Sequence, residues 1–256
     1  MNNPSPQSSR RKLITRGLAV AAGMSGLAVA ARLADRYGLI PPDGDGLYGP
    51  GETLTYAAQR LLAPHALARE FSRSQISNPP HQNGKPPRDA DFQRHQAVRF
   101  ADWRLAVDGM VARPASFSVG EIKSLPSRSQ ITHIACEEGW SYIAEWTGVP
   151  LLHILHVVGV LPQARYVVYF SIQRNWWDSI DMYDALHPQT LVTYAMNGAE
   201  LSAGFGGPLR LRVPRQLGYK SVKHINRLTV TDSLKGFGKG KGSSAAERGY
   251  AWYGGI

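Results

Sequence analysis

Cysteine is almost absent from this chain of 256 residues, which contains only Cys136. One thiol can form no internal disulfide, and it leaves no Cys-x-x-Cys pair for a zinc site or a covalently attached c-type haem. It also excludes an iron–sulfur cluster held by several cysteines. Any chemistry at Cys136 therefore uses a single sulfur from the chain.

Long hydrophobic runs are missing as well. The most apolar segment, residues 17–31, is shorter than the roughly 20 residues that a membrane-spanning helix needs. Hydrophobic residues make up 43% of the chain and charged residues 19%, beside 26 glycines and 17 prolines. This composition excludes wholesale disorder and predicts a loop-rich globular protein.

Acidic residues are outnumbered, with 19 Asp+Glu against 29 Lys+Arg and a formal charge of +10. Residues 1–34 hold five of the basic residues and no acidic ones, so half of the excess lies in that segment. Much of the remainder falls in a Gly-rich tail that includes Lys235, Lys239 and Lys241. No continuous basic face is indicated, and we expect no nucleic-acid partner.

The N-terminal segment, residues 1–34, has the layout of an export signal. Arg10 and Arg11 precede Leu13, Ile14 and the Gly/Ala-rich apolar run. The arginine pair resembles a twin-arginine signal, whose machinery exports folded proteins, and Ala34 ends a weak cleavage site. We expect a periplasmic or otherwise exported protein that meets the membrane only through this signal or a partner. The alternatives are a retained anchor and a plain basic tail.

Three further parts follow the signal. Residues 35–99 are irregular, with one helix-like stretch at 54–71, and four prolines and a glycine within residues 77–87 prevent regular structure there. Such a segment either covers a site or is a disordered linker. The compact domain is expected at 100–233. The tail, residues 234–256, ends in aromatic residues that favour docking on the domain, namely Tyr250, Trp252 and Tyr253.

The compact domain mixes strands and short helices. Residues 103–108 alternate as in a half-buried strand, Ser118 and Glu121 form a capping box, and Asn197-Gly198 predicts a tight hairpin turn. Further strands are expected at 129–136, 165–172, 191–196, 208–213 and 227–230, and helices at 150–158 and 179–186. Because these elements do not alternate regularly, the sequence predicts an α+β fold, a mixed sheet with short helices.

Cys136 follows a predicted strand and precedes the turn Glu137-Glu138-Gly139. A turn presents a side chain at the strand terminus. On its own, a lone cysteine is a small buried hydrophobe, a nucleophile or a metal ligand, and position alone does not decide among the three.

Four blocks in order resemble the sulfite-oxidase-type molybdopterin-binding domain. They are THIACEEGWS with WTGVPL (132–141 and 146–151), SIDM with ALHPQTL (179–182 and 185–191), YAMNG (194–198), and PLRLRVP with LGYKSVK (208–214 and 217–223). The resemblance covers about residues 95–233. It is closest to the bacterial branch that includes the periplasmic methionine-sulfoxide reductase catalytic subunits.

The resemblance implies a Mo-molybdopterin cofactor with one pyranopterin dithiolene. Cys136 matches the catalytic thiolate ligand of molybdenum, which suits a soft, deprotonated sulfur. The other positions implied to contact the cofactor are Asn83, His133, Ser171, Arg210, Ser221, Val222 and Lys223. Among these, Arg210, Ser221 and Lys223 suit the pterin phosphate, since Arg forms a bidentate fork and Lys adds a point charge.

Two positions depart from the family pattern. His133 replaces a common arginine, and Phe205 occupies a place that is often polar. Loss of a permanent cation, together with Glu137 and Glu138 near the site, disfavours an anionic substrate. His187 is expected to be a structural histidine rather than a catalytic one.

The resemblance therefore implies an enzyme that transfers an oxygen atom, with a sulfoxide or related small substrate, including sulfoxides in proteins. Electrons are expected to come from a separate haem-bearing partner, because the lone cysteine excludes a covalent c-type haem and a cysteine-ligated iron–sulfur cluster in this chain. The alternatives are a sulfite or oxyanion oxidase and a metal-free scaffold of the same fold. A monomer is expected, because too few residues follow Asp232 for the dimerisation domain of eukaryotic sulfite oxidases.

Overall fold

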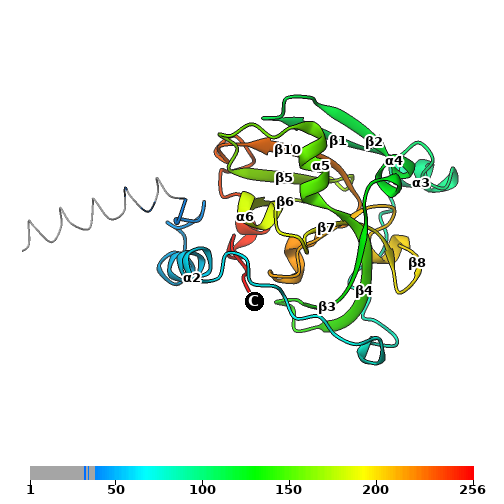
Figure 1. Cartoon of the computed structure of the whole chain (residues 1–256), viewed down its shortest axis with the longest axis horizontal. Coiled ribbons are helices and arrows are strands. Elements are labelled where there is room, and N and C mark those ends of the chain that lie inside the picture. The colour runs from blue at the N-terminus through cyan, green and yellow to red at the C-terminus, as the bar shows by residue number, and fades with distance from the viewer. Residues whose placement is uncertain (1–31, 33, 35–37) are drawn as a thin grey trace, which may run out of the picture. The chain divides into compact units, whose positions relative to one another are not determined.

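The computed structural model describes Arg32, Ala34 and residues 38–256 (Figure 1). The predicted export signal lies outside the described residues except at Arg32 and Ala34. The chain divides after Pro41, and the unit Pro42–Ile256 holds the fold. Among the described helices, none has both the length and the apolar character needed to cross a membrane.

Two five-stranded sheets form the unit (Figure 1). The first has the order β2-β1-β10-β5-β6, in which β1 and β10 are parallel and the other pairs antiparallel. The second is antiparallel, with the order β3-β4-β7-β8 and β9 paired to β7. The strands are β1 (Arg104–Gly109), β2 (Ala115–Ser118), β3 (Arg128–Ala135), β4 (Ser141–Pro150), β5 (Tyr166–Ser171), β6 (Trp177–Asp181), β7 (Leu191–Met196), β8 (Ala199–Glu200), β9 (Arg210–Arg212) and β10 (Ile225–Thr231).

The helices are short. They are α2 (Gly49–Leu62), α3 (Ala90–Ala97), α4 (Val119–Ser124), α5 (Leu151–Val158) and α6 (Met182–Ala185), with 3-10 turns η1 (Arg73–Gln75), η2 (Ala203–Phe205), η3 (Gly218–Lys220) and η4 (Ala246–Arg248). One main core joins α5 to both sheets, and it includes Phe92 of α3. This mixed arrangement confirms the predicted α+β class.

Local sequence signals account for several elements. Ser118 and Glu121 form the predicted capping box at the start of α4, with the Glu121 N–H donating to Ser118 Oγ at 3.1 Å. Asn197 and Gly198 both have positive φ angles, 51° and 78°, as the hairpin between β7 and β8 requires.

Two predicted helices differ from the structure. Residues 179–181 lie in β6, where Ile180 pairs with Val167 of β5, and the helix begins only after Asp181 accepts a hydrogen bond from the Asp184 N–H. The helix expected at 54–71 is α2, which ends at Leu62. Its end precedes Pro64, and proline disfavours helical backbone in the residue before it.

Helix α2 is held to the first sheet by a buried ionic network. Arg60 contacts Asp181 at 2.7 Å and Asp184 at 2.6 Å, and the Tyr56 hydroxyl donates to Asp181 at 2.7 Å. Burial raises the pKa of Asp181, and Arg60 opposes that rise by its charge. Because Asp181 and Asp184 are both buried, the stability of the fold depends on the positive charge that Arg60 places beside them.

We expect Arg60→Met to lower the free energy of unfolding by about 3 to 5 kcal/mol, because it leaves the buried Asp181 without a cation and leaves Asp184 only its longer contact with Arg215, at 3.8 Å. Urea denaturation measures the loss. Arg94→Met is the matched control, since Arg94 pairs with Asp91 at 3.6 Å on the surface. Equal stability of the two variants would show that the network contributes nothing to the attachment of α2.

The C-terminal tail docks on the same unit, as its aromatic residues suggested. Trp252 and Tyr253 are buried. The backbone N–H of Tyr253 donates to Glu52 at 2.6 Å, and the Trp252 indole donates to Ser179 Oγ at 2.8 Å. The tail therefore packs between α2 and β6, 20 residues or more beyond β10 in sequence.

Glu52 makes the stability of this junction pH-dependent. Burial, followed by the nearby Asp43, raises the pKa of Glu52 from 4.5 to about 7. Between these values the folded chain holds a proton that the unfolded chain has released, so stability falls as pH rises through that window, by at most about 3 kcal/mol.

We expect Glu52→Gln to remove this pH dependence, since an amide keeps the acceptor for Tyr253 without a charge. Urea midpoints of both proteins between pH 5 and pH 8 test it. The advantage of the variant should grow with pH. Parallel profiles for the two proteins would contradict the assigned protonation of Glu52.

Candidate active site

Cys136 lies at the tip of the hairpin between β3 and β4. The turn is closed by hydrogen bonds from the Cys136 N–H to Trp140 O and from the Gly139 N–H to Cys136 O, both 3.0 Å. Gly139 has φ +89°, a conformation that side chains disfavour. This closed turn presents the sulfur to a pocket of about 320 Å³.

The Cys136 sulfur is half-buried beside two carboxylates. Its thiol donates to Glu137 Oε2 at 3.0 Å, and Glu138 Oε2 is 3.8 Å away. Burial, and then the bond to Glu137, raises the pKa of the thiol to about 12. The thiol therefore keeps its proton unless a metal cation takes the proton's place.

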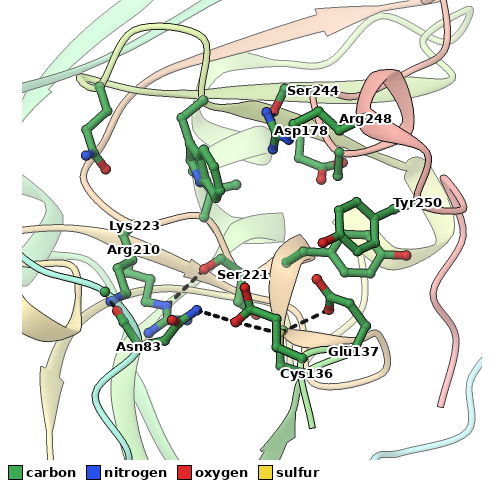
Figure 2. Close-up of a pocket in the computed structure, with 18 of the residues that line it drawn as sticks. Asn83, Cys136, Glu137, Asp178, Arg210, Ser221, Lys223, Ser244, Arg248 and Tyr250 are labelled. Atoms are coloured by element: carbon green, nitrogen blue, oxygen red, sulfur yellow. Dashed lines mark hydrogen bonds between the residues drawn. The ribbon is translucent and has the colours of Figure 1, made fainter. Parts of the chain in front are cut away.

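Three cations lie at the side of the pocket across from the C-terminal tail. Arg210 and Lys223 line the pocket, and Arg212 contacts the lining residue Ser221. Arg210 donates to Ser221 O at 3.0 Å and to Phe205 O at 3.1 Å, and Arg212 donates to His133 O at 2.5 Å. Lys223 donates to the carbonyls of Asn83 and Gly204 at 2.6 and 2.7 Å. Arg210, Lys223 and Asn83 are grouped in Figure 2.

These cations have no carboxylate partner. Within residues 38–256, the arginines and lysines that form ion pairs do not include Arg210, Arg212 or Lys223. Burial lowers the pKa of Arg212 to about 9 and that of Lys223 to about 7, and the charge of Arg210 adds to both shifts. Arg212 Nε is also buried without a hydrogen-bond partner. Such uncompensated positive charge suits an anionic ligand.

The Pro-rich loop forms part of the wall. Asn83, Gly84 and Lys85 line the pocket, and the Asn83 amide donates to Glu138 Oε2 at 3.0 Å. The Trp140 indole donates to the same oxygen at 2.7 Å. This lining favours a segment that covers a site, which is one of the two interpretations of residues 77–87.

The C-terminal tail supplies the far wall, which sequence reasoning missed. Ser244, Arg248 and Tyr250 line the pocket across from Arg210 and Lys223 (Figure 2). Ser244 is fixed to Trp177 O at 2.7 Å, and the Arg248 guanidinium lies 4.6 Å from the Trp176 ring centre. The aromatic end of the tail indicated docking, but nothing local indicated where.

The structure gathers most of the predicted site residues. Asn83, Cys136, Arg210, Ser221, Val222 and Lys223 all line the pocket. Ser221 Oγ already accepts from the Val213 N–H at 3.2 Å and from Arg212, so its hydroxyl orders the wall.

Two predicted residues lie outside the lining. The His133 ring faces Phe71, with 6.3 Å between ring centres, and only its carbonyl approaches the site through Arg212. Ser171 Oγ accepts from the Gln173 N–H at 3.2 Å, and Gln173 rather than Ser171 lines the pocket. His187 is buried between Ala66 O and the Gln189 N–H, which agrees with a structural histidine.

The residues present fit a metal-bearing pterin. A soft sulfur donor faces the pocket, and uncompensated cations suit a phosphate and a negatively charged dithiolene. No group of three or more His, Cys, Asp or Glu side chains able to hold a metal occurs in the described part of the chain.

Comparison with known proteins agrees with this site. Residues 92–236 match the oxidoreductase molybdopterin-binding domain. The chain belongs to this family, and it is a molybdenum-pterin oxidoreductase.

Two relatives are methionine-sulfoxide reductase proteins. YedZ1 of Azospira oryzae, provisionally named a protein-methionine-sulfoxide reductase subunit, is 37% identical over 195 residues, which cover 76% of this chain and 70% of YedZ1. The catalytic subunit MsrP of Xanthomonas axonopodis pv. citri is 30% identical over 154 residues, 54% of this chain and 48% of MsrP. This chain thus aligns with about half the length of MsrP.

A solved structure shares the fold. The sulfane dehydrogenase SoxCD of Paracoccus pantotrophus superimposes with a TM-score of 0.53 and 21% identity, over 66% of this chain and 46% of that one. The likeness supports a sulfite-oxidase-like fold. Asn83 and the tail residues from Ser244 to Tyr250 lie outside the family match, so the pocket is completed by segments that flank the family domain.

Proposed function

We propose that the protein reduces sulfoxides, with the methionine sulfoxide side chain as substrate. The observation that carries the proposal is the pair of carboxylates beside the sulfur of Cys136. A carboxylate repels sulfite, which is an anion, but not a sulfoxide, which is neutral. His133, at the position where the family often has arginine, turns its ring away from the pocket.

Aromatic side chains support the same choice. Trp140, Trp176 and Tyr250 line the pocket, and aromatic rings make favourable contacts with thioether sulfur. Trp176 and Tyr250 are 44% and 38% exposed, so they are accessible to a side chain that enters from solvent. The relatives named above as methionine-sulfoxide reductases give independent support.

The reaction needs two electrons and two protons, which convert a sulfoxide into a thioether and water. Molybdenum bound through Cys136 supplies the two-electron oxygen-atom transfer. The chain's own residues bind and orient: Arg210 and Lys223 neutralise the anionic cofactor, and the hydrogen bonds from Asn83 and Trp140 fix Glu138. We propose that each chain binds one pyranopterin and that the protein is a monomer. We also propose that a separate haem-bearing protein donates the electrons.

We also propose that residues 1–34 direct export by the twin-arginine pathway to the periplasm. The support is the sequence of that segment, in which Arg10 and Arg11 precede an apolar run. The pocket is closed by chain segments from both flanks of the domain, so the chain must fold to complete it. This suits a pathway that exports the protein already folded around its cofactor.

An anaerobic assay with a reduced viologen dye tests the proposed substrate. We expect N-acetylmethionine sulfoxide to be reduced with a kcat/KM at least about a hundredfold above that for sulfite oxidation with ferricyanide, a difference of roughly 3 kcal/mol. Preferred oxidation of sulfite would instead establish the oxyanion oxidase.

A further inference from the structure

Helix α2 turns its apolar side chains outward and its charged side chains inward. Leu54 and Leu61 are 73% and 64% exposed, whereas Glu52 and Arg60 are buried. Leu62 at the end of α2 and Leu47 just before its start are also exposed, at 84% and 90%, and together these four residues are called the leucine stripe. The other exposed residues of the helix are uncharged, namely Pro50, Gly51, Thr55 and Ala58. This is the reverse of an ordinary surface helix.

The orientation of α2 is fixed by its inner face. Arg60 is bound to Asp181 and Asp184, and Glu52 accepts from the tail. Tyr56 packs edge-on against Trp252 and Tyr253, with ring centres 5.8 and 5.0 Å apart. Rotation of the helix to bury the leucines would break these buried ionic contacts. The stripe therefore remains outward for a partner outside the unit.

The chain before α2 indicates which partner. Four basic residues precede the apolar run 17–31, and only residues 32–48 separate that run from the helix. Seventeen residues reach at most about 60 Å, so a membrane surface that binds the run, as a retained N-terminal segment would allow, lies within reach of α2. Helix α2 has 14 residues, about 21 Å, which is too short to cross a bilayer but suits a helix lying in its surface.

We propose that the leucine stripe of α2 inserts into the interfacial region of a lipid bilayer. A second copy of the chain is a poorer occupant, because a single 14-residue helix buries much less area than the roughly 800 Å² per partner of a stable interface. The absence of charge on the outer face makes insertion independent of anionic lipid. The contact is separate from the pocket and does not rest on the proposed reaction.

The test uses the full chain with Cys136→Ser and one new cysteine that carries an environment-sensitive fluorophore. The cysteine replaces Ala58 on α2 or, as the control position, Ser127, which is exposed in another part of the unit. Each protein is mixed with phosphatidylcholine vesicles that contain nitroxide-labelled lipid. We expect a blue shift and quenching at position 58 and neither at position 127.

The stripe variant Leu54→Gln/Leu61→Gln should lose the shift at position 58. The control variant Leu161→Gln/Leu186→Gln, which replaces two other exposed leucines, should keep it. Residues 1–31 are present in every protein, so their own affinity for lipid is common to all. No shift at position 58, or an undiminished shift in the stripe variant, would overturn the proposal. A shift that grows with protein concentration without vesicles would assign the stripe to a second copy instead.

Discussion

Replacing Cys136 with serine is expected to lower turnover of methionine sulfoxide at least about a thousandfold, equivalent to roughly 4 kcal/mol of transition-state stabilisation. A serine hydroxyl is a hard donor that keeps its proton, so it is a poor substitute for a thiolate on molybdenum. Cys136 is half-buried at a hairpin tip, and serine has nearly the same shape. The fold should therefore persist.

Turnover is measured with the viologen assay, and near-ultraviolet circular dichroism checks folding. Pterin should be retained in part, because Arg210 and Lys223 remain. A folded Cys136→Ser protein with wild-type turnover and metal content would show that the sulfur is not a ligand.

The variant Lys223→Met is expected to reduce cofactor retention about tenfold or more, while the stability of the cofactor-free chain changes by less than about 1 kcal/mol. The loss of two hydrogen bonds to the carbonyls of Asn83 and Gly204 is offset by removal of a half-buried charge that has no carboxylate partner. A purely structural lysine would lower both quantities together. Pterin fluorescence after gel filtration and urea denaturation measure the two effects.

The lowered pKa of Lys223 also predicts how retention of the cofactor depends on pH. Burial lowers its pKa to about 7, and an anionic ligand binds better to the protonated amine. Retention by the wild-type protein should weaken as pH rises above 7, and Lys223→Met should lack that part of the change. Lys123→Met is the control, because Lys123 pairs with Glu200 on the surface. Identical pH profiles for wild type and Lys223→Met would exclude a role of Lys223 in binding the anion.

Local chemistry explains why much of the fold was predictable. The capping box of Ser118 and Glu121 and the turn at Asn197-Gly198 depend on residues adjacent in sequence. The strand at residues 179–181 was missed because its pairing with β5 depends on register across the sheet rather than on its own pattern.

The site residues also divide into those that neighbouring sequence reveals and those that depend on contacts between distant segments. Cys136 and the segment from Ser221 to Lys223 were found because their neighbours form recognisable blocks, and the structure brings them to one pocket. The wall from Ser244 to Tyr250 was missed, because the contact of Ser244 with Trp177 joins residues 67 apart. His133 was placed by its match to the family, and its ring instead faces Phe71.

The inward charges of α2 show the same limit. Arg60 is buried because it pairs with Asp181 and Asp184. These partners lie more than 120 residues later in the chain, so the sequence around the helix does not reveal them. From sequence alone, the leucines of this helix are the expected inner face.

The most direct test of the central claim is the molybdenum and pterin content of the full chain, purified from a host that makes the cofactor. The account predicts about one molybdenum and one pterin per chain, with the metal lost in Cys136→Ser. Well-folded wild-type protein with neither molybdenum nor pterin would contradict it and leave a metal-free scaffold of the same fold.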